Sequence, residues 1–404
     1  MPVFLYVLGL AVFAQGTSEF MLSGLVPGIA RDLSVSVGAA ASLTSAYAVG
    51  MIVGAPLMAL VGARLPRRTA LGGFLAAFVV VHVVGAVTSD FAVLFGSRVV
   101  AAVVNAGFLA VALSTVSSLV APELAGRATS VLLAGVTLAC AVGVPAGALL
   151  GEWFGWRAAF WAVAGLCVPA LGWVVRVGGG GSVSGASGGS PGRASGGASG
   201  ASSGGVSGSG VRAELRLLGR PLLRRALGVG AAVNAATFAG FSYLAVIGTE
   251  VAGLSEGVVP VLLAVFGVGA FVGVTVSGRV GERWLGVVLL VLPFAWAVLA
   301  VTGEWGGVLF GGALVVGGLS FGAGSALVGR VLYVASPEAP VMAGAFATVA
   351  LNLGAFVGPL VAGGVTEVSG DYRDAVWVSV GFAVLAVVGG GRRRTRDEEG
   401  ASLG

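Results

Sequence analysis

Long apolar segments recur along the whole of this chain. Each is about 20 residues long, which is the length of helix that crosses the hydrocarbon core of a bilayer. Charged residues make up only 10% of the 404 positions, whereas they make up about 25% of the residues of a typical soluble protein. The sequence therefore predicts an all-α integral membrane protein.

We expect twelve transmembrane helices in two six-helix, pseudo-symmetric halves. The halves are residues 1–176 and 225–391, joined by a cytoplasmic linker at 177–224 and followed by a cytoplasmic tail at 392–404. The linker contains a stretch, 178–210, with 15 glycines and 10 serines, a composition typical of a flexible coil. The expected spans are 3–28, 38–62, 69–88, 91–116, 127–150, 157–176, 225–249, 258–278, 284–302, 306–331, 341–365 and 374–391.

The arginines predict the orientation of these spans. All 22 basic residues are arginine. With both termini in the cytoplasm, 18 of them lie in cytoplasmic segments, and only Arg31, Arg157 and Arg373 lie outside, while Arg98 lies within a span. This bias follows the positive-inside rule for a multi-pass protein of the cell membrane. It also accounts for the net charge of +5 without a nucleic-acid partner.

Two short arginine-containing loops occupy the same place in each half. The first reads Gly62-Ala63-Arg64-Leu65-Pro66-Arg67-Arg68, and the second reads Gly278-Arg279-Val280-Gly281-Glu282-Arg283. Such an echo indicates internal duplication. The loops resemble the Asp-Arg-x-Gly-Arg-Arg/Lys motif of the major facilitator superfamily, although Ala63 and Pro66 depart from it. The resemblance implies a gating role for Arg64, Arg67, Arg68, Glu282 and Arg283.

The fifth expected span contains Gly143-Val144-Pro145-Ala146-Gly147, with a weaker echo around Pro359. The segment resembles the Gly-x-Pro-x-Gly pattern of the antiporter branch of that superfamily, which implies a gating role for Gly143, Pro145 and Gly147. Physically, the proline removes one backbone hydrogen bond and the glycines permit close packing, so the span should bend. A structural kink without directional meaning is the alternative.

Two charges inside the membrane, Glu19 in the first span and Arg98 in the fourth, are the main candidates for function. A charge within a span is costly and usually marks a transport pathway. The segments around them and Gly155–Phe160 resemble twelve-span drug:proton antiporters, in particular actinobacterial chloramphenicol-efflux proteins and related sugar-efflux proteins. The resemblance implies that Glu19 and Arg98 couple transport to protons. A static ion pair between two helices is the alternative.

Neutral polar and aromatic residues within the spans are the candidates for substrate binding. They are Tyr47, Asn105, Asn234, Phe238, Phe241 and Asn352. Such groups suit a moderately hydrophobic neutral molecule. The alternative for each is a lipid-facing ring or a helix-to-helix hydrogen bond. The single histidine, His82, is more typical of a satisfied core residue than of a titrating one.

We therefore expect a proton-coupled antiporter that exports a small antibiotic, chloramphenicol by resemblance, through alternating access. Efflux of a sugar or another small metabolite is the alternative. One histidine, two cysteines within apolar segments and no carboxylate cluster favour neither an enzyme nor a metal site. The expected partners are the drug, protons and the lipid bilayer, with no cofactor, no nucleic acid and a monomeric protein. We expect proton coupling to reside in residues 1–176.

Overall fold

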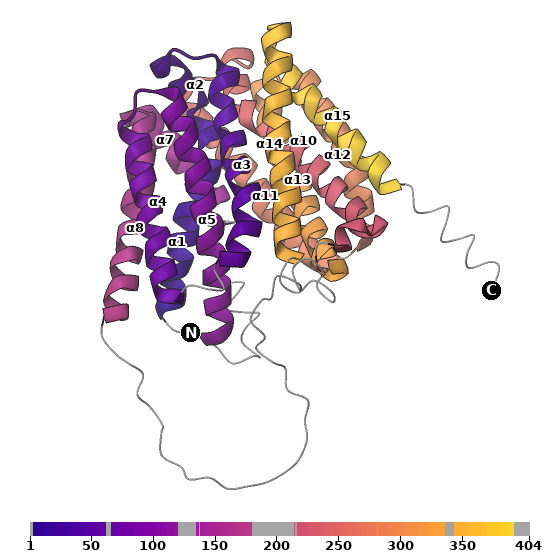
Figure 1. Cartoon of the computed structure of the whole chain (residues 1–404). Helices are drawn as coiled ribbons and strands as arrows, with labels where there is room; N and C mark the ends of the chain where they lie inside the picture. Colours follow the sequence, from indigo (N-terminus) through magenta and orange to yellow (C-terminus); the bar gives the residue numbers. More distant parts are fainter. Residues whose placement is uncertain are drawn as a thin grey trace, which may run out of the picture.

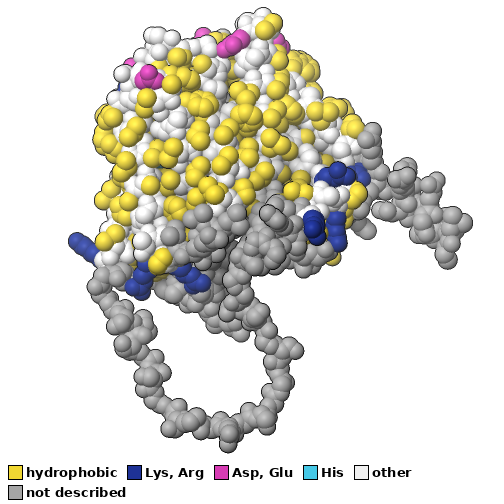
Figure 2. Space-filling view, in the orientation of Figure 1, with side chains coloured by type: hydrophobic (Ala, Val, Ile, Leu, Met, Phe, Trp, Pro, Cys, Tyr) yellow, Lys and Arg dark blue, Asp and Glu magenta, His cyan; other side chains and the backbone are white. Residues whose placement is uncertain are grey.

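The computed structural model describes residues 3–61, 66–119, 135–136, 138–179, 214, 216–280, 282–335 and 343–391. The described part consists of long helices that stand side by side in one bundle (Figure 1). Apolar side chains cover the sides of the bundle (Figure 2). This is the surface that a lipid-embedded protein presents.

The first half contains six membrane-crossing segments. In chain order they are α1 (Val3–Phe20) with α2 (Leu22–Leu33), α3 (Val37–Val61), α4 (Arg67–Val87), α5 (Phe91–Leu119), the π-helical turn η1 (Ala139–Gly143) with α7 (Val144–Phe154), and α8 (Trp156–Gly179).

The second half repeats this order. Its segments are α10 (Pro221–Val246) with the π-helical turn η3 (Ile247–Val251), α11 (Val259–Val280), α12 (Glu282–Thr302), α13 (Gly306–Ala335), α14 (Ala343–Ser369) and α15 (Asp374–Gly391). Short 3₁₀ turns, η2 (Arg216–Gly219) and η4 (Glu256–Val258), precede α10 and α11.

Ten helices of the described part are long and apolar enough to cross a membrane. Two shorter apolar helices, Ala139–Phe154 and Asp374–Gly390, complete the series. Together they match the twelve expected spans in order, so the predicted all-α membrane architecture is confirmed.

The two ends of the bundle carry opposite charge (Figure 2). We call one end the acidic face; the described acidic residues at the helix ends there are Asp32, Asp90, Glu152, Glu250, Glu256, Glu304, Glu367, Asp371 and Asp374. We call the other the arginine-rich face; its described arginines are Arg67, Arg68, Arg176, Arg216, Arg220, Arg224, Arg225 and Arg330.

Corresponding helices pair in the same way in both halves, as a duplicated architecture requires. In the first half α3 packs on α5, α1 on η1, and α4 on α8; in the second half α11 packs on α13, α10 on α14, and α12 on α15. Glycine makes the closest pairs: a Cβ at Gly50 would lie 2.2 Å from the carbonyl oxygen of Val99, and one at Gly269 would lie 2.1 Å from that of Leu314. Membrane helices approach this closely only at small residues.

The halves meet along two seams, and α2 also packs against α10 between them. Helix α14 packs against α3, and α11 packs against η1 and α7. At the first seam, Ser45 Oγ donates a hydrogen bond of 2.8 Å to the carbonyl oxygen of Phe356. The space between the seams holds the site described below.

The first span differs from its expected range of 3–28. It continues to Leu33 and ends at Ser34, which adopts φ 53°. Pro27 and Gly28 favour an earlier end in the sequence, but Leu25, Val26 and Ile29 are buried and hold the last turns in the bundle. The span is also broken at Met21, between α1 and α2.

The fifth span also differs from its expected range, 127–150, of which the described part begins at residue 135. The span runs on to Phe154, where Gly155 with φ 82° turns the chain into α8. Most of the expected linker, Arg64 and the tail lie outside the described residues.

Candidate functional site

A cavity of about 230 Å³ lies between the two halves. Its lining residues come from the middle of the helices and from their parts toward the arginine-rich face. Four phenylalanines make its walls largely apolar, and a small number of polar groups interrupt them. The lining residues include Glu19, Phe20, Cys140, Asn234, Thr237, Phe238, Phe271, Ser320, Phe321, Ser325 and Asn352.

Glu19 is the only ionisable carboxyl group among the lining residues. Its side chain is half-buried. Among the described residues it has no hydrogen-bond or ion-pair partner. A carboxyl group without a partner inside a membrane protein is free to exchange a proton or to meet a ligand.

The chain around Glu19 leaves the regular helix. Helix α1 ends at Phe20 and α2 begins at Leu22. Two carbonyl groups released by the break find other donors: Arg98 NH2 donates to the Ser18 carbonyl at 2.7 Å, and Ser23 Oγ donates to the Phe20 carbonyl at 3.0 Å. Broken membrane helices persist where such substitutes satisfy the backbone.

Arg98 lies behind this break, buried within the first half. Its guanidinium also donates to Ser18 Oγ at 2.9 Å and to His82 Nε2 at 3.3 Å. It stacks over the rings of Tyr47 and Phe160, at 4.8 and 5.4 Å from their centroids. Arg98 and Glu19 form no ion pair, so the static pair considered from the sequence is absent from this structure.

The hydrogen bonds of His82 define its tautomer. Nδ1 lies 2.8 Å from the carbonyl oxygen of Phe78, which can only accept, so Nδ1 carries the hydrogen. Nε2 then accepts from Ser18 Oγ at 2.6 Å and from Arg98. Both ring nitrogens are used by a neutral imidazole, and the ring packs 4.1 Å from that of Phe78. This is the satisfied core histidine that the sequence favoured.

Two predicted substrate-binding residues lie elsewhere. Asn105 Nδ2 donates to the Tyr47 hydroxyl at 2.8 Å, and both side chains are buried within the first half. Neither lines the cavity. Their amide and hydroxyl groups satisfy each other, which is the helix-to-helix alternative for these positions.

Three of the predicted residues do line the cavity: Asn234, Phe238 and Asn352. Phe241 does not, because it stacks on Phe266 with centroids 4.5 Å apart and is only 2% exposed. It supports Phe238 from behind, at 6.2 Å.

Sequence reasoning missed several lining residues. They are Phe20, Cys140, Thr237, Phe271, Ser320, Phe321 and Ser325. Phe20 and Thr237 adjoin predicted residues and could have been found that way. The others lie on apolar, glycine-rich helices whose composition does not indicate which face meets the cavity.

The predicted Gly143-Pro145-Gly147 motif packs on the helix that carries Glu19. A Cβ at Gly143 would lie 2.1 Å from Thr17 Oγ1, and one at Gly147 would lie 3.0 Å from Met21 Cβ. The π-helical turn η1 ends at Gly143, two residues before Pro145, whose missing N–H interrupts the ladder of backbone hydrogen bonds. The motif therefore joins the fifth span tightly to the broken first span.

The gating loops are described only in part. Arg67 and Arg68 are exposed on the arginine-rich face. Arg64 and the side chains of Glu282 and Arg283 lie outside what the structure describes.

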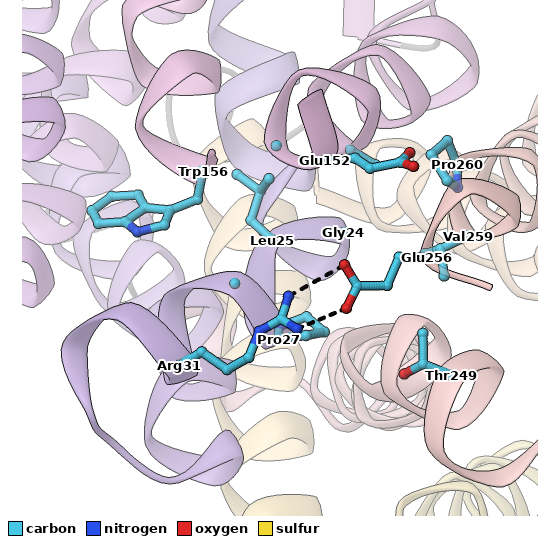
Figure 3. A pocket seen from close by; sticks show the side chains of 13 residues that line it. Gly24, Leu25, Pro27, Arg31, Glu152, Trp156, Thr249, Glu256, Val259 and Pro260 are labelled. Carbon is cyan, nitrogen blue, oxygen red and sulfur yellow. Dashed lines mark hydrogen bonds and ion pairs between the residues drawn. The ribbon is translucent and has the colours of Figure 1, made fainter. Parts of the chain in front are cut away.

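The acidic side of the cavity is closed by contacts between the halves (Figure 3). Arg31, near the end of α2, donates from NH1 to Glu256 Oε1 at 2.7 Å and from NH2 to Oε2 at 3.3 Å. We call this pair the latch. Nearby, Ser36 Oγ donates to Glu367 Oε1 at 2.7 Å. A residual pocket of about 60 Å³ remains beside the latch, between Glu152, Trp156 and Thr249.

A comparison with protein families identifies this architecture. The family model described as Major Facilitator Superfamily matches residues 8–339. The chain belongs to the major facilitator superfamily. Proteins of this superfamily are membrane transporters rather than enzymes.

The alignments with three curated relatives of this major facilitator cover between 69% and 95% of it. The "Chloramphenicol resistance protein" of Streptomyces lividans is 50% identical over 366 residues, which is 90% of this chain and 88% of that protein. The "Inner membrane transport protein YdhP" of Escherichia coli (strain K12) is 31% identical over 95% of this chain and 92% of that protein. The "Chloramphenicol efflux pump Rv0191" of Mycobacterium tuberculosis is 30% identical over 69% of this chain and 63% of that protein.

Solved structures agree on the fold of this major facilitator. A bacterial homologue of the human lysosomal transporter Spinster, in an inward-facing and unoccupied conformation, superposes with a TM-score of 0.76. The match covers 96% of this chain and 95% of that one at 18% identity, so it bears on the fold alone.

Proposed function

We propose that this major facilitator is a proton-coupled antiporter that exports a small, moderately hydrophobic antibiotic, with chloramphenicol as the leading candidate. The observation that carries the proposal is the unpartnered carboxyl group of Glu19 in the wall of a largely apolar cavity. The 50% identity to the Streptomyces lividans chloramphenicol resistance protein supports the choice of drug.

The mechanism follows from competition at Glu19. A proton or a drug can occupy the space beside this carboxyl group, and the drug lies against Phe20, Phe238 and Phe321. Proton entry from the outside displaces the drug outward, and proton release to the inside resets the site. Alternating access exposes the cavity to one side at a time. Arg98 keeps the chain broken beside Glu19 by holding the Ser18 carbonyl.

The orientation is part of the proposal. The arginine-rich face is cytoplasmic, with both termini on that side, as the positive-inside rule favours. The latch then closes the outer side, and the cavity lies toward the cytoplasm, where an exporter collects its cargo. The chain acts as a monomer, with the halves 1–176 and 225–391 joined by a cytoplasmic linker at 177–224 and followed by a tail at 392–404.

Growth of a drug-susceptible bacterium that expresses the chain tests this function. We expect the wild type to raise the chloramphenicol concentration that stops growth, and Glu19→Gln to lose this protection. Glu250→Gln is the matched control, because this glutamate is exposed on the acidic face. Full protection by Glu19→Gln contradicts the proton-coupling role.

Efflux of a small hydroxylated metabolite is the second candidate. Five neutral hydrogen-bonding side chains line the cavity: Asn234, Thr237, Ser320, Ser325 and Asn352. This is more polar capacity than the sequence suggested. If no antibiotic in a panel is better tolerated while labelled sugars are expelled, this candidate replaces the first.

A further inference from the structure

Ser320 differs from most other hydroxyl groups of the membrane helices. Serine and threonine within a helix usually donate to a carbonyl of the preceding turn. Thr17, Thr115, Thr237 and Ser379 do so here. The Ser320 hydroxyl makes no hydrogen bond with any described residue, although the side chain is only 1% exposed.

An unpartnered hydroxyl in such a place is costly. Burial without a partner forfeits the hydrogen bonds that water would supply. Ser320 lines the cavity between the halves, so the partner that it lacks can arrive with a ligand. Ser242 is likewise buried and unpartnered, but it does not line the cavity, so a ligand bound there cannot form a hydrogen bond with it.

Other residues that line the cavity with Ser320 present hydrogen-bond acceptors. Asn234 Nδ2 donates to the carbonyl of Leu351 at 2.6 Å, and Asn352 Nδ2 donates to that of Thr348 at 2.9 Å. Since a carbonyl only accepts, the nitrogen of each amide faces it, and each Oδ1 stays available as an acceptor. Thr237 has already given its hydrogen to Val233. Ligand hydroxyl groups therefore suit this wall.

The charged groups around the cavity further limit the class of ligand that it can bind. No arginine or histidine is among its lining residues, and Arg98 is engaged behind α1. An anionic ligand would meet Glu19 without a compensating cation. Phe20 and Phe321 follow Glu19 and Ser320 directly in the chain, and their ring centroids lie 6.2 Å apart in the wall of the cavity. An aromatic ligand in the cavity can therefore pack against these rings.

We propose that Ser320 is a specificity-determining residue that pairs with a hydroxyl group of a neutral aromatic ligand. The inference rests on the proposed function and deepens it, because it assigns the ligand's polar end to the second half of the protein. The aromatic end then lies against the phenylalanines beside Glu19, where the drug and the proton compete.

Chloramphenicol binding to the purified full chain in lipid nanodiscs tests this assignment. We expect Ser320→Ala to weaken binding about fivefold, the size of one lost neutral hydrogen bond. The midpoint of thermal unfolding without drug should stay unchanged or rise, because the variant removes an unsatisfied group. Ser242→Ala is the matched control and should bind chloramphenicol as the wild type does.

Three results would overturn the assignment. Unchanged affinity of Ser320→Ala contradicts it directly, while the proposed function stands if the wild type binds the drug. Weaker binding together with a lower unfolding midpoint assigns Ser320 to packing instead. A wild-type chain that binds no chloramphenicol contradicts the proposed substrate, and the assignment falls with it.

Discussion

At the scale of single residues, the two intramembrane charges have different tasks. The terminal nitrogens of Arg98 donate to the Ser18 carbonyl, the Ser18 hydroxyl and His82, whereas Glu19 has no hydrogen-bond or ion-pair partner among the described residues. The sequence predicted that both charges matter, because charge inside a span is rare. It did not predict which of the two side chains would be hydrogen-bonded, because the partners of Arg98 lie 80 and 16 residues away along the chain.

His82 tests this division of tasks. Replacing it with alanine leaves the Ser18 hydroxyl and one Arg98 nitrogen without their acceptor. We expect His82→Ala to lower the free energy of unfolding by about 1–3 kcal/mol. The pH dependence of efflux should stay unchanged, because both ring nitrogens of the neutral imidazole are hydrogen-bonded and exchange no proton during transport. Thermal unfolding in detergent measures the stability, and transport across a pH series measures the pH dependence. A shifted pH profile would mean that His82 takes part in proton transfer.

At the scale of helices, the break in the first span and the glycine motif of the fifth form one unit. Apolar length and period predicted both spans. The break at Met21 was not predictable from local sequence, because it depends on a donor from α5. The motif's purpose was left open between gate and kink, and the structure adds the contact that explains its glycines: Gly143 lies against Thr17.

This contact predicts how two glycines of the first half respond to the same change. Gly143→Ala would bring a methyl group within 2.1 Å of Thr17 Oγ1. We expect a loss of about 1–3 kcal/mol in unfolding free energy, as in other overpacked interiors. Gly165→Ala, on α8 with nothing within 4 Å of the added carbon, should be neutral or slightly stabilising. Equal unfolding midpoints for the two variants would show that the close approach is not required.

At the scale of the whole molecule, the duplication and the twelve spans could be predicted from the sequence. The residues that line the cavity could be predicted only in part. Asn234, Phe238 and Asn352 line the cavity, and their role in substrate binding stays a prediction, while Asn105 is hydrogen-bonded to Tyr47 away from it. Helical spacing gives the face that a residue shares with its neighbours. It does not say whether that face meets the other half, the lipid or another helix of the same half.

The latch predicts how the halves respond to charge. Arg31 and Glu256 are 65% and 58% exposed, so their attraction is worth at most about 1 kcal/mol, or a few-fold in population. In a Cys167→Ser background, Cys140 in the cavity is the single cysteine and reports outward opening. We expect Glu256→Arg to speed its labelling by an impermeant maleimide, added outside intact cells, about three- to tenfold.

Exchanging the two charges provides the control for the latch. The double variant Arg31→Glu with Glu256→Arg restores opposite charges and should return labelling toward the wild-type rate. Equal labelling rates in all three proteins would mean that other contacts, such as Ser36 with Glu367, keep the outer side closed.

Proton–drug exchange in proteoliposomes tests the central claim most directly. Purified chain is reconstituted with a pH-sensitive dye inside the vesicles, and chloramphenicol movement and internal pH are followed under an imposed pH gradient. We predict that the wild type moves drug against protons, and that Glu19→Gln abolishes the coupled proton movement while it still binds the drug. Coupled exchange at the wild-type rate in Glu19→Gln would contradict the account.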